Sequence, residues 1–407
     1  MSEQDASIEK APIEMSVIAQ TDADVLIVGG SLSNCLTALW MAEERPDILI
    51  GLVDAEPSLL QDRQWVFFDN TVPQHLYRRL RNYVTQRWHG YETRGASGKK
   101  QGQLSISRLC GNRVAKSIEA SPRIEVLSSA EVTAVATDAI ELSGVDLISA
   151  PLILDGRPLE PHRSMKFGQR HGCEFRLRCA TPHELQHPVL ADTSVDQSNG
   201  FAFLQTTPMS ETDLAITYVC ANREEAMDAE AAKSAILRHA VAEGLSVTNA
   251  RQTMQWSDPL LTGLDRSIFA NFVLRKAVPT GQAALLYHPT TLSPVVAAAH
   301  TAHNFAQTNE LSTDAVMSVL AEQMATAHGQ HIFHHELNAQ ILDSQTPDFG
   351  VQLLEHIHSL PESLITRFYS ADCRSRDRVR ISMVRPGNSL VKAGIAISQL
   401  GGSKRAP

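Results

Sequence analysis

The chain has 407 residues, of which 43% are hydrophobic, 20% charged and 5% aromatic, and its formal net charge at pH 7 is −9. This apolar share excludes an intrinsically disordered chain, and 22 glycines with 19 prolines exclude a collagen-like one. An acidic chain lacks the basic surface of a nucleic-acid-binding protein, so we expect no nucleic-acid partner. The length suggests two or three domains, and the composition favours a globular enzyme without naming its reaction.

The six cysteines form no CxxC pair and show no metal-ligand spacing, so we expect free thiols and no metal. Residues 1–22 are polar and acidic, without a basic segment followed by an apolar one. This pattern argues against a signal peptide and predicts a flexible leader. The sequence also has no run of about 18 apolar residues that could cross a membrane. We therefore expect a cytoplasmic protein.

The first elements predicted are a strand, a helix and a second strand. Residues 24–30 read DVLIVGG, a short apolar run that ends in glycine, and residues 48–54 read ILIGLVD. Between them, apolar residues recur at helical spacing until Pro46. A strand, glycine turn, helix and strand within about thirty residues make a βαβ unit and hence a parallel sheet.

Later segments predict a second kind of sheet. Residues 165–220 contain the alternating runs CEFRLRC, GFAFLQTTP and DLAITYVC, which indicate an antiparallel sheet with one covered face. Other strands are expected at 104–107, 123–133, 148–156 and in AALLYHP, which reaches Pro289. Helices are expected at about 223–244, in VVAAAHTAHNFA at 295–306, and over most of the tail from about 308 to 400.

The glycine turn is compared with the dinucleotide fingerprint Gly-x-Gly-x-x-Gly, in which only Gly29 stands where a glycine is wanted. Ser31 occupies the place where a backbone approaches the pyrophosphate, and Asn34 the place where the helix packs on the strand. Asp54 follows at the right distance to bind a ribose hydroxyl. The turn is therefore either a phosphate site that uses the helix N-terminus or a βαβ unit that has lost its nucleotide.

Several segments, taken in order, carry a family resemblance: DVLIVGGSLSNCLTALWMAEERPD, LVDAEP, QWVFFDN, RWHGYETR, LILDGRP, ADTSVDQSNGFAFLQTTPMS, LLYHPTT and LPESLITRFYSADCRSRDRVRI. From about residue 24 to about residue 398 the chain resembles the bacterial FAD-type lycopene β-cyclases. The resemblance implies an α/β fold in which a Rossmann-type FAD-binding domain with a parallel sheet carries an inserted antiparallel-sheet substrate domain and a helical C-terminal part.

The resemblance also implies domain ranges and a reaction. The FAD-binding domain is expected at 23–62, 112–160 and 275–305, the substrate domain at 63–111 and 161–274, and the helical region at 306–407. In such cyclases reduced FAD, with NAD(P)H as the reductant, assists the non-redox closure of the ends of an apolar polyene such as lycopene into β-rings. A substrate of this kind implies peripheral contact with the inner face of the cell membrane.

The same resemblance places FAD contacts in the glycine turn with its ribose acid, in an Asp-Gly turn and in a loop that lines the flavin ring. These residues are Gly29, Gly30, Ser31, Asn34 and Asp54, then Asp155 and Gly156, then His288, Pro289, Thr290, Thr291 and Pro294. Pro294 is also expected to open a helix whose positive end lies near the flavin. The family usually has Gly-Tyr after HPTT, whereas here Leu292 alone precedes Ser293 and shortens the loop.

A further departure concerns the catalytic acid. The family has a strand with an acidic pair, whose glutamate is taken to be catalytic, but here these positions hold Thr217 and Tyr218. A threonine hydroxyl is far too weak an acid to protonate an alkene. We predict that Asp192, which falls on a family aspartate, lines the site and replaces the acid. The other acids nearby, which we expect in solvated loops or turns, are Asp196, Glu211 and Asp213.

Three functions are therefore compatible with the sequence. The first is a lycopene-cyclase-like enzyme of carotenoid biosynthesis. The second is a flavin-dependent oxidoreductase or hydroxylase acting on another apolar substrate, and the third is a non-catalytic FAD-binding paralogue. Thr217 argues against the first, Ser31 and the shortened loop favour the third, and the length of the resemblance favours either enzyme.

Two other clusters carry alternatives. His331, His334 and His335 lack the His-Glu-x-x-His spacing of a zinc site, so we expect them on a solvated helix face. The aromatic residues between positions 65 and 91 could stabilise a cation or belong to the core. They are Trp65, Phe67, Phe68, Trp88 and Tyr91.

Overall fold

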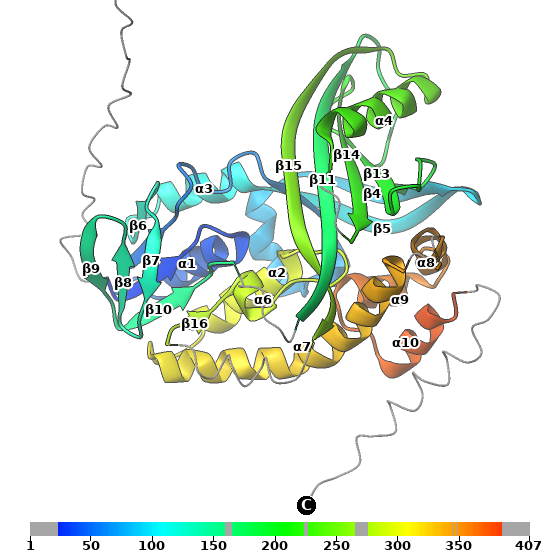
Figure 1. Cartoon of the computed structure of the whole chain (residues 1–407). Helices are drawn as coiled ribbons and strands as arrows, with labels where there is room; N and C mark the ends of the chain where they lie inside the picture. Colours follow the sequence, from blue (N-terminus) through cyan, green and yellow to red (C-terminus); the bar gives the residue numbers. More distant parts are fainter. Residues whose placement is uncertain are drawn as a thin grey trace, which may run out of the picture.

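The computed structural model describes residues 23–158, 165–223, 227–264, 276–343, 345–346 and 348–384. Its main bodies are a parallel sheet with its helices and a larger curled sheet, with C-terminal helices packed beneath the latter (Figure 1). This arrangement confirms the predicted fold class. The predicted leader at 1–22 and the end of the helical region at 385–407 lie outside the described residues.

The parallel sheet has the strand order β16-β10-β1-β2-β6. Its strands are β1 (Val25–Val28), β2 (Ile50–Val53), β6 (Ile124–Leu127), β10 (Leu152–Asp155) and β16 (Val278–Pro279). All four residues of β1, β2 and β10 are buried, as expected for parallel strands covered on both faces. The predicted βαβ unit at 24–54 is thus confirmed.

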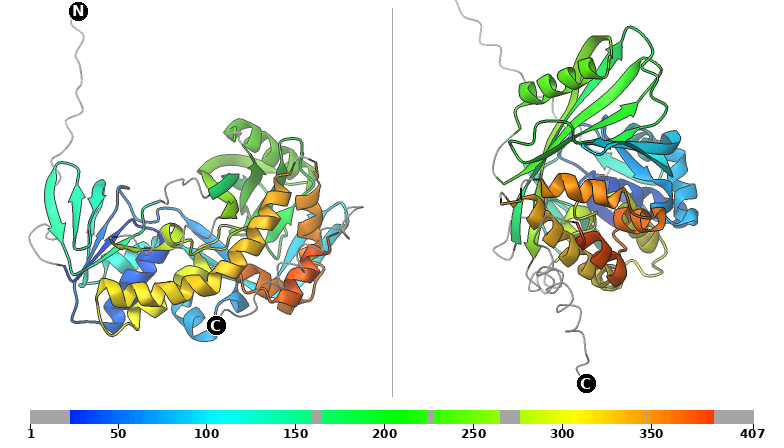
Figure 2. Two further views of the ribbon diagram at one scale, coloured as in Figure 1. Left: turned by 60° about the horizontal axis from the view of Figure 1, so that its bottom comes forward. Right: turned by 90° about the vertical axis from the view of Figure 1, so that its right-hand side faces the viewer.

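Two layers cover this sheet. On one side lie the helices α1 (Leu32–Glu44), α3 (Gly111–Glu119) and α6 (Val295–Ala306), and Trp40 of α1 is fully buried in that core. On the other side lies a small sheet of β7 (Val132–Val135), β8 (Ala139–Leu142) and β9 (Val145–Ser149). The small sheet forms one end of the molecule (Figure 2).

The larger sheet has the strand order β15-β11-β14-β13-β12-β4-β5-β3. Its strands are β3 (Gln64–Phe68), β4 (Val84–Gly95), β5 (Gly98–Cys110), β11 (Met165–Cys179), β12 (Val189–Asp192), β13 (Phe201–Pro208), β14 (Asp213–Asn222) and β15 (Val247–Leu264). Only β12 and β4 pair in parallel. The antiparallel pairing predicted for residues 165–220 is confirmed.

This sheet has an outer and an inner face. On the outer face, Cys173, Phe175 and Leu177 of β11 pack against α4 (Ala229–Ala242). Successive strand residues point to opposite faces, so Arg170 and Glu174 of the same strand point to the inner face. Phe203 and Val219 also belong to the inner face, where they join the core under the C-terminal helices.

The C-terminal helices are α7 (Thr313–Ile341), α8 (Phe349–Ile357), α9 (Glu362–Tyr369) and α10 (Ser375–Ser382). The helix α7 is 29 residues long and runs from the parallel sheet to the region beneath the larger sheet (Figure 2). It therefore contacts both bodies, packing on α6 at one end and on β15 at the other. None of the described helices is long and apolar enough to cross a bilayer.

Three predictions of local structure were wrong. Residues 123–133 are not one strand, because they are divided between β6 of the parallel sheet and β7 of the small sheet. AALLYHP is no strand, because β16 ends at Pro279 and residues Gly281–Ala284 form the 3-10 turn η4. The amide of Leu286 then donates to the carbonyl of Gly281, which closes the turn. Residues 148–156 form parts of two strands, β9 and β10, that belong to different sheets. The apolar pattern alone did not reveal these breaks.

The segment between 64 and 110 is more regular than its sequence pattern indicates. It forms β3, β4 and β5, with the short helix α2 (Gln74–Leu80) and the 3-10 turns η2 (Asp69–Thr71) and η3 (Arg81–Tyr83) between the first two. The strands β4 and β5 make a long hairpin whose register shifts at two places. These shifts disturb the alternation by which a strand is recognised in a sequence.

Candidate functional site

The glycine turn lies at the carboxyl end of β1, where Gly29 has a φ of +91° that favours glycine. A Cβ on Gly30 would overlap the Asp54 carboxylate, and the Gly30 amide donates a hydrogen bond to that carboxylate. Asp54, at the end of β2, also accepts a hydrogen bond of 2.8 Å from the Glu56 amide. The structure thus brings the turn and the predicted ribose acid into direct contact.

Ser31 caps α1 and its side chain is exposed. Its hydroxyl accepts a hydrogen bond of 3.3 Å from the Asn34 amide, which occupies one of the free donors at the helix N-terminus. The remaining amides of the first turn carry the positive end of the helix dipole. This end of the helix can therefore bind an anion.

Asn34 has a different role, because its side chain is fully buried. Its Nδ2 donates to the carbonyls of Val28 at 3.0 Å and Gly29 at 2.7 Å, and its Oδ1 accepts from the Thr280 hydroxyl at 2.6 Å. Asn34 thus ties β1 to the segment after β16 with hydrogen bonds that a third glycine could not make. A Cβ on Gly156 would overlap this amide, so a side chain there would disrupt the link.

The predicted Asp-Gly turn follows β10 at the same edge of the sheet. Both carboxylate oxygens of Asp155 accept from Arg157, at 3.0 and 2.9 Å, and its carbonyl accepts from the Thr280 amide at 2.9 Å. Gly281 follows Thr280 and has a φ of +54°. It lies next to Ser31, because a Cβ on Gly281 would be 3.6 Å from the Ser31 hydroxyl oxygen. Three segments far apart in the chain thus meet at the glycine turn.

The HPTT loop, residues 288–291, is built around His288. The ring Nδ1 accepts from the amides of Thr290 at 3.2 Å and Thr291 at 3.0 Å, and Nε2 donates to the Phe368 carbonyl at 2.8 Å. This pattern requires the neutral ring with the proton on Nε2. Burial lowers the pKa of His288 to about 4, so the ring stays neutral at physiological pH.

The loop is held from three sides. Asn338 of α7 donates to the Pro289 carbonyl at 2.9 Å, and the Thr290 hydroxyl lies 2.9 Å from Nδ1 of His334 in the same helix. Arg170 of β11 donates to the Thr290 carbonyl at 3.2 Å and also to that of Thr291. These contacts fix the loop between the larger sheet and the C-terminal helices.

The loop ends as the sequence predicts. Pro294 is the N-cap of α6, so the positive end of that helix lies beside the loop. Leu292 has a φ of +58°, a left-handed conformation that a leucine rarely adopts.

The inner face of the larger sheet meets the HPTT loop through Arg170, whose guanidinium lies 5.9 Å from the Phe203 ring and 5.8 Å from the Trp256 ring. The indole of Trp256 covers Gly172, where any Cβ would overlap it. Beyond Trp256 lies a set of register partners that we call the central row, one residue from each of four adjacent strands. Its members are Met254, Glu174, Thr217 and Gln205, all half-buried.

The sequence prediction did not identify Arg170 or Glu174, although a signal was present. In QRHGCEFRLRC the charged residues alternate with buried ones, so they share one face of a strand. Such a face ordinarily meets solvent. Here Arg170 at one end of the face meets the HPTT loop, whereas Arg178 at the other end is exposed.

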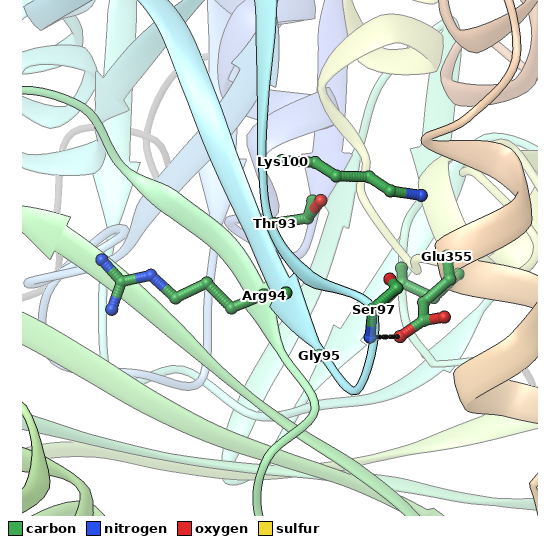
Figure 3. Close-up of a pocket in the computed structure, with 8 residues that line it drawn as sticks. Thr93, Arg94, Gly95, Ser97, Lys100 and Glu355 are labelled. Carbon is green, nitrogen blue, oxygen red and sulfur yellow. Dashed lines mark hydrogen bonds between the residues drawn. The ribbon is translucent and has the colours of Figure 1, made fainter.

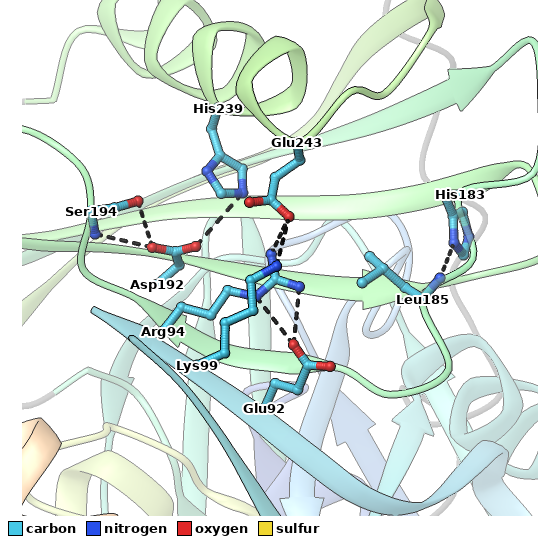
Figure 4. Close-up of polar contacts among 9 residues, drawn as sticks. All are labelled: Glu92, Arg94, Lys99, His183, Leu185, Asp192, Ser194, His239 and Glu243. Carbon is cyan, nitrogen blue, oxygen red and sulfur yellow. Dashed lines mark hydrogen bonds and ion pairs between the residues drawn. The ribbon is translucent and has the colours of Figure 1, made fainter. Parts of the chain in front are cut away.

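Asp192 lies elsewhere, on the outer face under α4 (Figure 4). Its Oδ1 accepts from the amide of Ser194 at 3.0 Å and from its hydroxyl at 2.6 Å, and its Oδ2 is 3.9 Å from Nε2 of His239 in α4. Arg94 and Glu243 form an ion pair of 2.6 Å beside it. The structure does not bring Asp192 together with the glycine turn or the HPTT loop, and these contacts favour a structural role.

The expectation that the helix histidines lie on a solvated face was wrong. His331, His334 and His335 are all buried: the His331 ring packs on Tyr287, the His334 ring on His288, and the His335 ring on His331. Burial lowers the pKa of His331 to about 4 and that of His335 to about 3. Within the described part of the chain, no three His, Cys, Asp or Glu side chains are grouped to hold a metal.

The aromatic residues between 65 and 91 divide between two environments. Phe67 and Trp65 belong to the core around α1, whereas Phe68, Trp88 and Tyr91 pack beneath the larger sheet near α9. A small pocket lies close by, between the tip of the β4–β5 hairpin and Glu355 of α8 (Figure 3). Its volume of about 10 Å³ holds no more than a water molecule, so it is not a substrate site.

Comparison with known proteins identifies the family. Residues 24–394 match the family model described as "Lycopene cyclase protein". The chain belongs to the lycopene cyclase family. It is 24% identical to the lycopene beta-cyclase of Pantoea ananas, over 90% of this chain and 96% of the relative. It is also 24% identical to that of a Paracoccus species, over 89% of this chain and 94% of the relative. The resemblance stated from the sequence is thus confirmed.

Solved structures share the fold at lower identity. A geranylgeranyl bacteriochlorophyll reductase-like protein from Thermoplasma acidophilum matches with a TM-score of 0.61 and 10% identity, covering 93% of this chain and 99% of that one. A probable FAD-dependent monooxygenase of Pseudomonas aeruginosa, pqsL, matches with a TM-score of 0.54 and 14% identity, covering 81% of this chain and 100% of that one. These likenesses establish the architecture of this lycopene cyclase family member.

Proposed function

We propose that the chain binds FAD at the edge where β1, β2, β10 and β16 end. The residues there fit a dinucleotide: the α1 N-terminus offers amides for a pyrophosphate, Asp54 is placed for a ribose, and Gly30 leaves no room for a side chain. The HPTT loop and the start of α6 would hold the flavin ring. The FAD-dependent enzymes that share this fold support the assignment.

We further propose that the enzyme closes the ends of a linear polyene such as lycopene into β-rings, as part of carotenoid biosynthesis. The observation that carries this proposal is the family match over residues 24–394, which includes every segment of the site. NAD(P)H would serve as the reductant. The substrate would be taken from the inner face of the cell membrane, with which the protein would make peripheral contact.

The reaction requires a proton, a stabilised cation and a dry site. When bound in its reduced form, FAD supplies an electron-rich ring that stabilises a carbocation. The chain supplies the aromatic rings of Trp256 and Phe203 on the inner face, which stabilise positive charge in the same way. The core under the C-terminal helices excludes water from the part of this face that carries Phe203 and Val219. The proton returns at the end, so the reaction is an isomerisation.

The proposal is tested by expressing the protein in a lycopene-accumulating bacterial host and by recording the visible spectrum of the purified protein. We expect β-rings in the extracted pigment and bound flavin absorbing at about 450 nm. Bound flavin with unchanged lycopene would overturn the cyclase and favour a flavin-dependent oxidoreductase or hydroxylase. Absence of both would favour a non-catalytic paralogue that has lost its flavin.

A further inference from the structure

The inner face of the larger sheet has few carboxylates. The acidic residues in the described strands of this sheet are Glu92, Glu174, Asp192, Asp213 and Asp258. Asp192 points to the outer face under α4, and so does Glu92, which pairs with Arg94 at 3.0 Å beside Glu243 of the loop after α4. Three acids therefore remain on the side that faces the HPTT loop.

Two of these three already have a cation as partner. Asp213 lies at the rim of the sheet and makes a 2.8 Å ion pair with the exposed Arg178. Asp258 stands in register with Arg170; burial raises the pKa of its carboxyl group, and the charge of Arg170 offsets part of that rise. Glu174, in the central row, is the acid that lies between them on the inner face.

The surroundings of Glu174 leave one of its oxygens available. The Thr253 hydroxyl donates to Oε1 at 2.7 Å and thereby orients the carboxyl group. Among the described residues, Oε2 has no hydrogen-bond donor. Thr217, the register partner of Glu174 on β14, has a shorter side chain than the glutamate that the resemblance places there.

Solvent reaches this part of the inner face although it lies on central strands. Glu174, Thr217 and Gln205 are each half-buried, whereas Ile216, beside Thr217 on the outer face, is fully buried. The neighbouring inward row lies two residues away on each of these strands. Its members Gly172, Val219 and Phe203 stand in register, and Trp256 covers Gly172. Alternate strand residues are about 7 Å apart, so a group held against Glu174 also lies near aromatic rings.

Positive charge lies on the other side of the row. Arg176 occupies the next inward position of β11. Burial lowers the pKa of Arg108 on β5, the charge of Arg176 lowers it further, and the charge of Glu174 raises it. The Arg176 Nε is buried and has no hydrogen-bond partner among the described residues. Two guanidinium groups, those of Arg176 and Arg108, thus lie in the neighbourhood of Glu174.

We infer that Glu174 is the proton donor and acceptor of this site, standing one strand away from the position where the family carries its acid. The inference rests on the proposed cyclase function. Glu174 in its neutral form gives its proton to a terminal double bond of the polyene, and the cation attacks a neighbouring double bond to form the ring. The carboxylate then takes a proton from carbon beside the ring cation, whose C–H electrons form the new double bond. Atoms and charge balance without a further reactant.

The test compares four variants in the lycopene-accumulating host and with purified, flavin-loaded protein. They are Glu174→Gln, Glu211→Gln, Thr217→Glu and the double variant Glu174→Gln with Thr217→Glu. Glu174→Gln should lower ring formation at least about 100-fold without changing flavin content or the melting temperature. Glu211→Gln, which makes the same change in the turn before β14, should leave turnover unchanged. In the double variant Glu174→Gln with Thr217→Glu, the carboxylate moves to the register partner in the same row. Ring formation in the double variant should be at least about tenfold higher than in Glu174→Gln.

The outcomes separate the inference from the function. If Glu174→Gln keeps more than a third of the wild-type turnover, the inference is overturned and the cyclase function stands. If the wild type is inactive but Thr217→Glu forms rings, the inference is likewise overturned, because Glu174 does not supply the proton. If both wild type and Thr217→Glu are inactive although flavin is bound, the proposed function fails, and the inference fails with it.

Discussion

Arg170 of the larger sheet donates a 3.2 Å hydrogen bond to the carbonyl oxygen of Thr290 in the HPTT loop. Burial lowers the pKa of Arg170 to about 10, so its guanidinium is still charged at neutral pH. A single side chain therefore joins the sheet that would hold the substrate to the loop that would hold the flavin.

Arg170→Met should remove this connection. The carbonyls of Thr290 and Thr291 would lose a charged donor, and Asp258 would lose the charge that stabilises it. We expect the free energy of unfolding to fall by about 2–3 kcal/mol and FAD to bind about tenfold more weakly. Thermal denaturation and flavin titration measure the two effects. Arg178→Met, on the same strand but exposed, should leave both unchanged. Normal flavin affinity in Arg170→Met would mean that His288 and Asn338 suffice to hold the loop.

The two non-glycine positions of the fingerprint should respond in opposite ways. Asn34→Gly restores the third glycine of the fingerprint but removes the three hydrogen bonds of a buried side chain, so we expect a loss of at least about 3 kcal/mol in stability. Ser31→Gly should cost only a few tenths of a kcal/mol, because glycine is an acceptable N-cap. It should bind FAD at least as tightly as the wild type. Equal stability of the two variants, measured by urea unfolding, would contradict the structural role of Asn34.

The buried histidines predict instability in acid. The pKa values of His288 and His331 are lowered to about 4 and that of His335 to about 3, against about 6.5 in an unfolded chain. Since the unfolded state binds these protons first, their contribution to stability is complete above pH 6.5. It is lost as the pH falls from about 6.5 towards 4, at about 1.4 kcal/mol per pH unit for each histidine.

Urea unfolding at a series of pH values measures this slope. His331→Gln should reduce the slope by the contribution of one histidine, while His89→Gln, at an exposed site, should leave it unchanged. A wild-type stability that stays constant between pH 6.5 and 4.5 would show that the histidines are accessible to protons in the folded state.

Asp192→Asn tests the acid predicted from the sequence. Asp192 accepts two hydrogen bonds from Ser194 on the outer face, so an amide there should cost about 1–2 kcal/mol of stability. Ring formation per folded molecule should be unchanged. Loss of turnover by 100-fold in a stable, flavin-loaded variant would instead identify Asp192 as the acid and contradict its placement under α4.

The sequence predicted the parts of the fold that depend on local pattern. The βαβ unit at 24–54 and the alternating strands at 165–220 have periods that identify them directly. AALLYHP failed because the chain turns at Gly281–Ala284, directly after Thr280, whose hydroxyl donates to Asn34. A contact between residues 246 positions apart leaves no local pattern.

The site was harder to predict for the same reason. The two faces of β11 are distinguishable in the sequence, but which of them meets solvent depends on where the HPTT loop lies. The helix histidines show the opposite case. Three of them on a polar helix indicate solvent, yet all three are buried, His334 against His288 of the loop and His331 against Tyr287 beside it. Asp192 was chosen for its place along the chain, and its side chain points to the opposite side of the sheet.

The parallel sheet also has consequences for how the protein is made. Its central strand is β1, but its edge strand β16 and the HPTT loop come more than 220 residues later, after the whole of the larger sheet. A chain still emerging from the ribosome therefore cannot complete the edge proposed to bind FAD, where β1, β2, β10 and β16 end, until almost three quarters of it has been synthesised. Contacts this distant slow folding. Cofactor capture should accordingly be a late event, and a chain that stops before residue 278 would expose the edge of β10.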